Sequence, residues 1–167
     1  MKLDASRSRV AISTFAEGLF SALAHNLELV AGDVTGEATA SSAEVHVPVA
    51  SIRVSGVVKR GKVDAGVLSS GDRAAIERQI RDEVLAGSEI VARGEQVGSH
   101  ASIEVKGPRG STRVTCDAAI TRQDDLTHVK GRVELSLAAL GCPPVKGPMG
   151  AFRVSDRVRI DFDLVFA

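Results

Sequence analysis

The carboxyl-terminal part of the chain alternates apolar and charged residues over a long stretch. One parity holds Phe152, Val154, Val158, Ile160, Phe162, Leu164 and Phe166, and the other holds Arg153, Arg157, Arg159, Asp161 and Asp163. Successive side chains of a strand point to opposite faces of the sheet. The pattern therefore predicts a strand with one buried face and one solvated or salt-bridged face.

Shorter runs of the same period recur along the chain. Their buried-face candidates are Val10, Ile12 and Thr14; Leu27, Leu29 and Ala31; Val45, Val47 and Val49; Ala101, Ile103 and Val105; Val114, Cys116, Ala118 and Ile120; and Val129, Val133, Leu135 and Leu137. Many short strands predict an all-β, antiparallel fold whose sheet edges must be hidden. A closed barrel hides them completely, and a sandwich is the alternative.

Residues 72–87 have a helical period, because Ile76, Ile80 and Val84 recur every four residues. Asp72 stands where it can cap the first turn, and Gly87 stands where a left-handed terminal residue is expected. We therefore expect one α-helix here.

The remaining connections are expected to be less regular. A short helical turn is predicted over residues 17–25, between the first two strands, and a long irregular connection over residues 55–72. The loop GCPPVKGPMG, residues 141–150, is expected to join the last two strands. Its Val145 and Met149 then form an apolar cap over one end of the barrel.

Composition bounds the classes of protein to consider. The 167 residues are enough for a single domain, residues 1–167, with a core that needs no disulfide or structural metal. The 21 basic residues balance the 21 acidic ones, and Trp and Tyr are absent, which argues against a nucleic-acid partner. No apolar run approaches the roughly 18 residues of a membrane span, so no integral membrane segment is expected.

The first residues, MKLDASRSRV, lack the apolar region of a signal peptide, which predicts a cytoplasmic protein. In a reducing compartment Cys116 and Cys142 are expected to be free thiols.

Three segments resemble the YceI-like family. They are AAIERQIRDEVLAGSEIVARG, similar to its helix-then-strand segment; SLAALGCPPVKGPMGAFRVSDRVRIDFDLVF, similar to its closing hairpin; and SALAHNLELVAGDVTGEA, similar to its early Ala-His segment. The resemblance covers most of the chain in order. It implies an extended antiparallel lipocalin-like barrel of about eight strands with a helix, a polyisoprenoid or similar long apolar ligand inside it, and a homodimer.

A barrel lined by Val, Ala and Thr is either filled by these side chains or hollow enough for one ligand, and aromatic-poor walls favour the hollow form. The function predicted is non-catalytic binding or carriage of an isoprenoid, quinone or lipid-like molecule. His25 is the candidate to orient the ligand, with Lys146 the weaker one. The full set of expected ligand contacts is Phe20, His25, Val45, Val47, Val49, Ile80, Val84, Ile103, Val105, Val145, Met149 and Phe152.

Other chemistry has little support. His46, His100 and His128 are widely spaced, so no metal site or cofactor is expected. The loop GCPPVKGPMG lacks the order of a phosphate-binding loop, and no nucleophile motif occurs. We expect no enzyme.

Two alternatives stay open. The first is an enzyme acting on a small apolar substrate, with His25 or Asp125 transferring a proton, or with Asp117 and Asp156 in a polar cluster. The second is a ligand-free structural or stress-related protein with a filled core.

Overall fold

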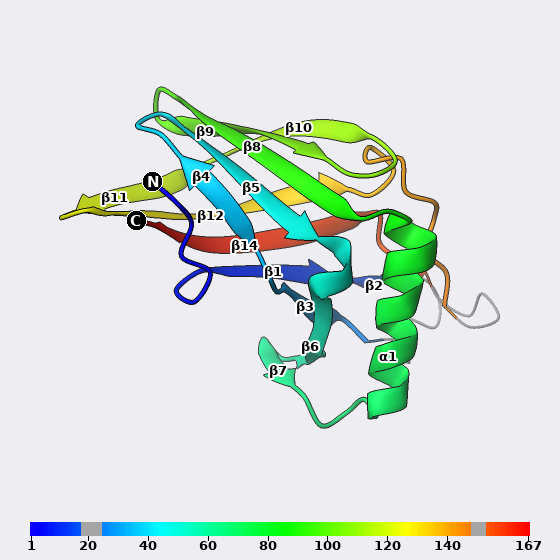
Figure 1. The fold of residues 1–167 in the computed structure, drawn as a ribbon. Helices are drawn as coiled ribbons and strands as arrows, with labels where there is room; N and C mark the ends of the chain where they lie inside the picture. Colours follow the sequence, from blue (N-terminus) through cyan, green and yellow to red (C-terminus); the bar gives the residue numbers. More distant parts are fainter. Residues whose placement is uncertain (18–24, 148–152) are drawn as a thin grey trace.

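Antiparallel strands make up most of the chain in the computed structural model, which describes residues 1–17, 25–147 and 153–167 (Figure 1). The strands are β1 (Arg9–Thr14), β2 (Ala16–Glu17), β3 (Leu27–Ala31), β4 (Thr35–Ala38), β5 (Ser42–Pro48), β6 (Ile52–Lys59), β7 (Lys62–Asp64), β8 (Glu89–Val97), β9 (His100–Lys106), β10 (Ser111–Cys116), β11 (Ala118–Gln123), β12 (Leu126–Ser136), β13 (Arg153–Val154) and β14 (Arg157–Phe166). The helical segments are η2 (Val49–Ser51), α1 (Ser70–Gln79) and η3 (Ile80–Leu85).

Two large sheets face each other across the interior. One has seven strands in the order β11-β12-β14-β1-β3-β6-β7, and the other has five in the order β10-β9-β8-β5-β4. All pairings between strands in the described ranges are antiparallel. The helix α1 lies across one end of the sheets, and the β11–β12 hairpin lies at the opposite end with the two termini (Figure 1). We call these the helix end and the far end. The predicted all-β, lipocalin-like barrel with one helix is confirmed.

Bent strands carry the chain from one sheet to the other. Strands β10 and β11 are separated only by Asp117, yet β10 pairs with β9 and β11 pairs with β12. On the opposite side, β3 pairs with β6 while β4 pairs with β5, so the β3–β4 and β5–β6 segments bend together. The bend is held by Ser51, whose hydroxyl donates to the carbonyls of Gly32 and Pro48.

Residues 2–4 link the edge strand β4 of the smaller sheet to the end of β14 in the larger sheet. Leu3 N–H donates to Gly36 O at 2.9 Å, and Asp4 N–H donates to Val165 O at 2.8 Å. The same short segment therefore contacts β4 in the smaller sheet and β14 in the larger one. Because its backbone groups are paired on both sides, the interior is enclosed there as well.

The helix begins earlier than predicted. Its N-cap is Ser69, whose side chain accepts from Asp72 N–H, while the Asp72 carboxylate accepts from Ser69 N–H at 3.1 Å. Asp72 thus completes a capping box instead of capping alone. After Gln79 the helix continues as a π-helical turn, η3, in which Val84 and Leu85 are buried.

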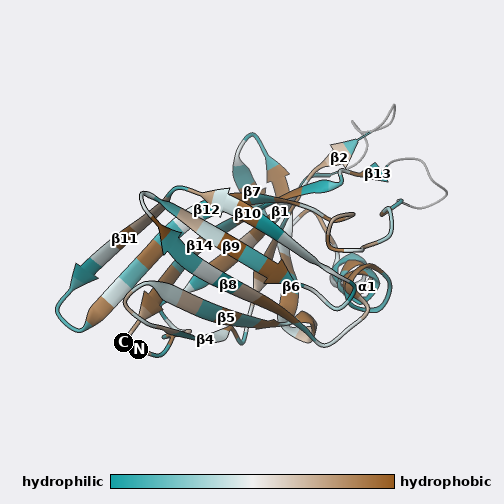
Figure 2. Ribbon diagram, turned by 90° about the horizontal axis from the view of Figure 1, so that it is seen from above, coloured by the Kyte–Doolittle hydropathy of each residue, from teal (hydrophilic) through white to brown (hydrophobic). Residues whose placement is uncertain are grey.

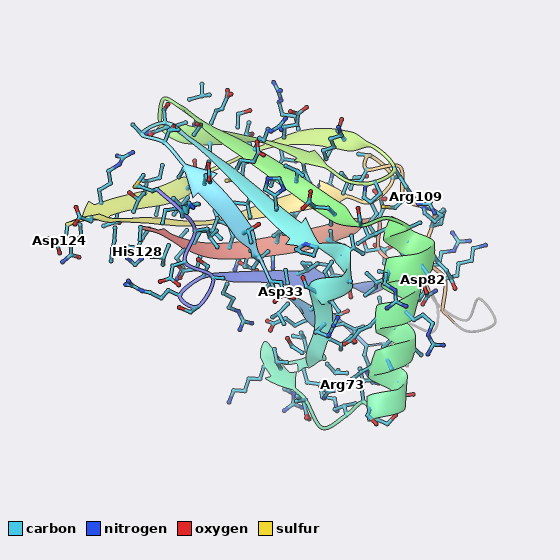
Figure 3. The ribbon with its side chains drawn as sticks, viewed as in Figure 1. Asp33, Arg73, Asp82, Arg109, Asp124 and His128 are labelled. Carbon is cyan, nitrogen blue, oxygen red and sulfur yellow. The ribbon has the colours of Figure 1, made fainter. Side chains whose placement is uncertain are left out.

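The left-handed residue that ends the helical segment is Ala86, with φ 49°, and not Gly87 as predicted. Gly87 is required for a different reason. A Cβ at this position would collide with the ring of Pro108 in the β9–β10 loop. That loop packs on the helix, since Arg109 donates to Glu83 O at 3.1 Å, and Figure 3 shows Arg109 beside the end of α1.

The segment predicted to be irregular, residues 55–72, contains regular structure. Strand β6 continues to Lys59, and β7 returns beside it from Lys62. Arg60 and Gly61, with φ 50° and 76°, form the tight turn between them. Two consecutive positive φ angles suit the right-handed twist of a hairpin, which explains the short connection.

Hydropathy alternates along the strands, as Figure 2 shows in brown and teal. The outward parity of β14 makes ion pairs with neighbouring strands. Arg132 Nε lies 2.6 Å from Asp161 Oδ1, and Lys130 Nζ lies 3.3 Å from Asp163 Oδ2. The predicted salt-bridged outer face is confirmed.

The predicted helical turn over residues 17–25 is not tested, because residues 18–24 lie outside the described ranges; Glu17 itself belongs to β2. The strand predicted from Phe152 onward is divided into β13 and β14 by Ser155 and Asp156.

Replacing Gly87 with Ala should lower the free energy of unfolding by about 1–3 kcal/mol, because the new methyl group must displace the Pro108 ring. Gly107→Ala is the matched control, since the nearest atom to a Cβ there is 3.8 Å away. Urea denaturation of both variants measures the difference. Equal stabilities would contradict the proposed role of Gly87.

His46 should make stability depend on pH. The carboxylates of Glu89 and Glu44, 3.2 and 2.8 Å from its ring nitrogens, raise the pKa of His46 above 6.5. Its stabilising contribution is therefore complete below about pH 6.5 and is lost as pH rises through the raised folded pKa. His46→Gln should lose up to about 1 kcal/mol relative to the parent at pH ~5.5 and nothing at pH ~9. A loss that is the same at both pH values would contradict this assignment.

Candidate functional site

A cavity of about 670 Å³ runs through the interior between the two sheets. This volume lies in the range of sites that hold small organic ligands, about 300–1,000 Å³. Both large sheets, α1 and η3 contribute to its walls. The hollow form of the barrel, which the sequence left open against a filled core, is the observed one.

The walls are apolar because each strand contributes one parity of its alternation. On β1 these residues are Val10, Ile12 and Thr14, whereas Ala11 and Ser13 are buried without lining the cavity. The side chains are mostly branched and short, so they cover the walls without meeting across the centre. The same alternation of apolar and polar residues that predicts the strands therefore also gives the cavity its apolar walls.

Phe162 is the aromatic side chain in the walls among the described residues. It lies opposite Gly131 in the β12–β14 pairing. A Cβ at Gly131 would come within 2.5 Å of the Phe162 ring. The glycine leaves room for the ring against the sheet, which keeps the centre of the cavity clear.

The structure brings most of the predicted contact residues together around this cavity. Those that line it are His25, Val45, Val47, Ile80, Val84, Ile103, Val105 and Val145. Val49 does not, because β5 ends at Pro48 and the chain turns into η2, where Val49 is buried in the packed core with 2 % of its surface exposed. Phe20, Met149 and Phe152 lie outside the described residues.

Several lining residues were absent from the predicted contact set. They come from β3, β8, β12 and β14 and include Leu29, Ala92, Val133, Ile160 and Leu164. Most of these residues carried the alternation that predicted the strands. The available signal was the parity itself, since every residue on the buried face of a hollow barrel is a wall residue.

The helix end of the cavity has a mixed rim. Leu68, Ile76 and Ile80 provide apolar surface, and His25 and Lys146 lie beside them as exposed polar residues. Asp72 also reaches this rim, but its carboxylate is held in the capping box. The hydrogen bond from the Ser69 hydroxyl lowers the pKa of Asp72, so this group is ionised at neutral pH.

The far end has a more polar rim. Arg122, Thr39, Ser41, Ser42 and Gln96 line the cavity there. Arg122 donates from Nη2 to the carbonyl of Ala40 at 2.7 Å, which connects β11 with the β4–β5 turn. Sequence reasoning missed this group, although Arg122 follows Ala118 and Ile120 on one parity of β11.

The acidic residues considered for catalysis lie away from the cavity. Asp117 is 88 % exposed and pairs with His100 at 2.6 Å. Asp156 accepts from the Ser136 hydroxyl at 2.6 Å and from Ala138 N–H at 2.7 Å, and the Ser136 bond lowers its pKa. Asp125 is exposed in the β11–β12 turn, whose position at the far end is marked by Asp124 and His128 in Figure 3.

Cys116 and Cys142 are free thiols, as predicted. Burial raises the pKa of both, so the thiol form predominates near neutral pH. A protonated thiol is a poor nucleophile.

Within the described residues no three His, Cys, Asp or Glu side chains are grouped so as to hold a metal ion. The helices of these same ranges include none with the length and apolar character needed to cross a membrane.

Comparison with known proteins identifies relatives at the level of the fold. No family model matches the sequence, and no curated protein matches it. Among solved structures, the crystal structure of BcnA from Burkholderia cenocepacia superposes with a TM-score of 0.67 over 99% of this chain and 99% of that chain, at 15% sequence identity. The likeness spans 99% of both chains, and it shows that the two proteins share a fold.

Proposed function

We propose that this protein binds a long apolar molecule, such as an isoprenoid, a quinone or a lipid, inside its barrel and carries it without chemical change. The observation that supports the proposal is the cavity of about 670 Å³ with walls made of branched aliphatic side chains. The resemblance to the YceI-like family points to the same class of ligand.

The walls supply the binding energy in this proposal. Burial of apolar surface contributes about 25 cal/mol per Å², or about 0.8 kcal/mol per methylene, so ten buried methylenes contribute about 8 kcal/mol before the costs of association. A flexible chain needs no other group to be retained. The predicted contacts that line the cavity, Val47 and Ile103 among them, are the proposed wall contacts.

An enzymatic reaction has less support. The deep part of the described lining is aliphatic, and its polar groups lie at the two rims. The carboxylate that reaches the helix-end rim, Asp72, is bound within a capping box. Cytoplasmic location and pairing of two copies stay sequence predictions, and the proposed binding does not depend on them.

Purified protein should release a long apolar molecule on solvent extraction, or should take one up when an apolar fluorescent dye such as N-phenylnaphthylamine is added. A long-chain isoprenoid alcohol should displace the dye. Protein that is empty as isolated and also fails to bind the dye and the alcohol would contradict the proposal.

Val47 is a wall residue that is only 8 % exposed. Val47→Trp should therefore abolish dye binding, because the indole would project into the cavity and fill the space that the dye needs. The fold should tolerate the ring better than a filled core would, where overpacking costs about 1–3 kcal/mol. Val63→Trp is the matched control, since Val63 is 42 % exposed on β7. Ala92→Phe, on β8, tests the same wall by a second route. Unchanged binding in both cavity variants would contradict the proposal.

A hollow interior should also appear in the cost of removing phenylalanine rings. Phe166 is fully buried in packed surroundings, so Phe166→Ala should cost about 3–5 kcal/mol. Phe162 faces the cavity and has fewer neighbours to lose, so Phe162→Ala should cost clearly less. Urea denaturation of the ligand-free variants measures both values. Equal costs would indicate a filled core and a structural role.

A further inference from the structure

We propose that the ligand is an amphiphile with an anionic head group, a carboxylate or a phosphate, and that Arg122 binds this head group at the far end of the cavity. The inference rests on the proposed function, because it gives a chemical class and an orientation to the molecule in the same cavity.

Arg122 lies on the inward-facing parity of β11. On β11 the residues that line the cavity are Ala118, Ile120 and Arg122, all of one parity. Arg122 pairs with Thr127 of β12, which also lines the cavity. A guanidinium therefore ends an otherwise apolar wall at the far end, where Arg122 itself is exposed to solvent. This position allows a charged head group to stay partly hydrated while its chain is buried.

Arg122 differs in its partner from three arginines of the strands that make close ion pairs. Arg9, Arg93 and Arg132, on the outer faces, each lie within 2.5–2.6 Å of a carboxylate oxygen. Among the residues described, no carboxylate oxygen lies within 4.0 Å of the Arg122 guanidinium nitrogens, whose hydrogen bond goes to the neutral carbonyl of Ala40. A guanidinium has five N–H donors in a planar fork that fits carboxylate and phosphate oxygens.

The Ala40 hydrogen bond also holds the guanidinium in place before a ligand arrives. It ties the side chain to the β4–β5 turn, which is itself closed by Thr39, whose backbone N–H donates to Ser42 O at 2.8 Å. A positioned donor loses less conformational entropy on binding than a mobile one.

Other polar groups surround the same rim. Gln96 lies on the inward parity of β8 and supplies an amide. Glu95 reaches the rim but belongs to the outward parity, opposite Ser42 of β5. The charged group directed inward from these strands is therefore Arg122.

The apolar walls set the direction of the chain. From Thr127 to Leu135 the cavity-lining parity of β12 spans eight residue steps, or about 26 Å of strand at about 3.3 Å per residue. With its head group at Arg122, a ligand would extend along this wall toward α1. Only a long chain would reach His25 and Lys146 at the helix end.

The test compares acids with the corresponding alcohols on the full chain. Oleate is paired with oleyl alcohol, and farnesyl phosphate with farnesol, so that carboxylate and phosphate are judged separately. Arg122→Gln should weaken binding of at least one of the two acids about tenfold or more and should change the alcohols by less than about twofold, because a charge-assisted hydrogen bond is lost only with the acids. Arg122→Lys should recover part of the loss.

Arg113→Gln is the matched control, since it removes a positive charge from an exposed residue of β10 that pairs with Glu104 and does not line the cavity. It should leave all four dissociation constants unchanged. Unchanged acid binding by Arg122→Gln would overturn the proposal, and so would a loss of acid binding in Arg113→Gln of the same size. If acid binding is unchanged and the variant self-associates instead, Arg122 protects the edge strand β11 and the proposal is wrong.

The two proposals fail in different ways. If the parent protein binds the alcohols and acids equally, and Arg122→Gln does the same, the cavity function stands and the head-group assignment falls. If none of the four probes binds the parent protein, the cavity function itself is refuted.

Discussion

Backbone pairing within the two large sheets, and the backbone and side-chain hydrogen bonds that link one sheet to the other, are the constraint on which the other features depend. A hollow interior gives up the contacts that side chains make across a filled core, so the main chain has to hold the walls apart. Strand pairs, the bend at Ser51 and the short segment at residues 2–4 supply those hydrogen bonds. With the walls fixed in this way, small aliphatic side chains suffice to line the cavity.

The strands and their buried faces could be predicted from the sequence, because a period of two is a local property that the sheet preserves. Local breaks in that period could not. Pro48 reads as one more residue of a strand, but the chain turns there and removes Val49 from the wall. Arg60 is not a residue expected at positive φ, so the sequence of the β6–β7 hairpin predicts an irregular connection.

The ends of the barrel depend on contacts between distant segments, which limits what the sequence can predict about the site. The sequence predicts that Gly87 ends the helix, but the structure requires a glycine there because it leaves space for the Pro108 ring. Arg122 reads as the end of a strand, since a charged residue usually interrupts a buried face. Its relation to Ala40, 82 positions earlier, exists only in the folded chain.

The outer face of the barrel is built separately from its inner face. Ion pairs such as Arg132–Asp161 connect β12 and β14 on the outer face. The alternate residues of the same two strands face the cavity. Exchange of inward residues can therefore change the volume and polarity of the interior while the cross-strand ion pairs stay as they are. A scaffold of this kind can diversify its ligands by substitution at alternate positions, and such divergence would lower sequence identity between relatives while leaving their backbones superposable.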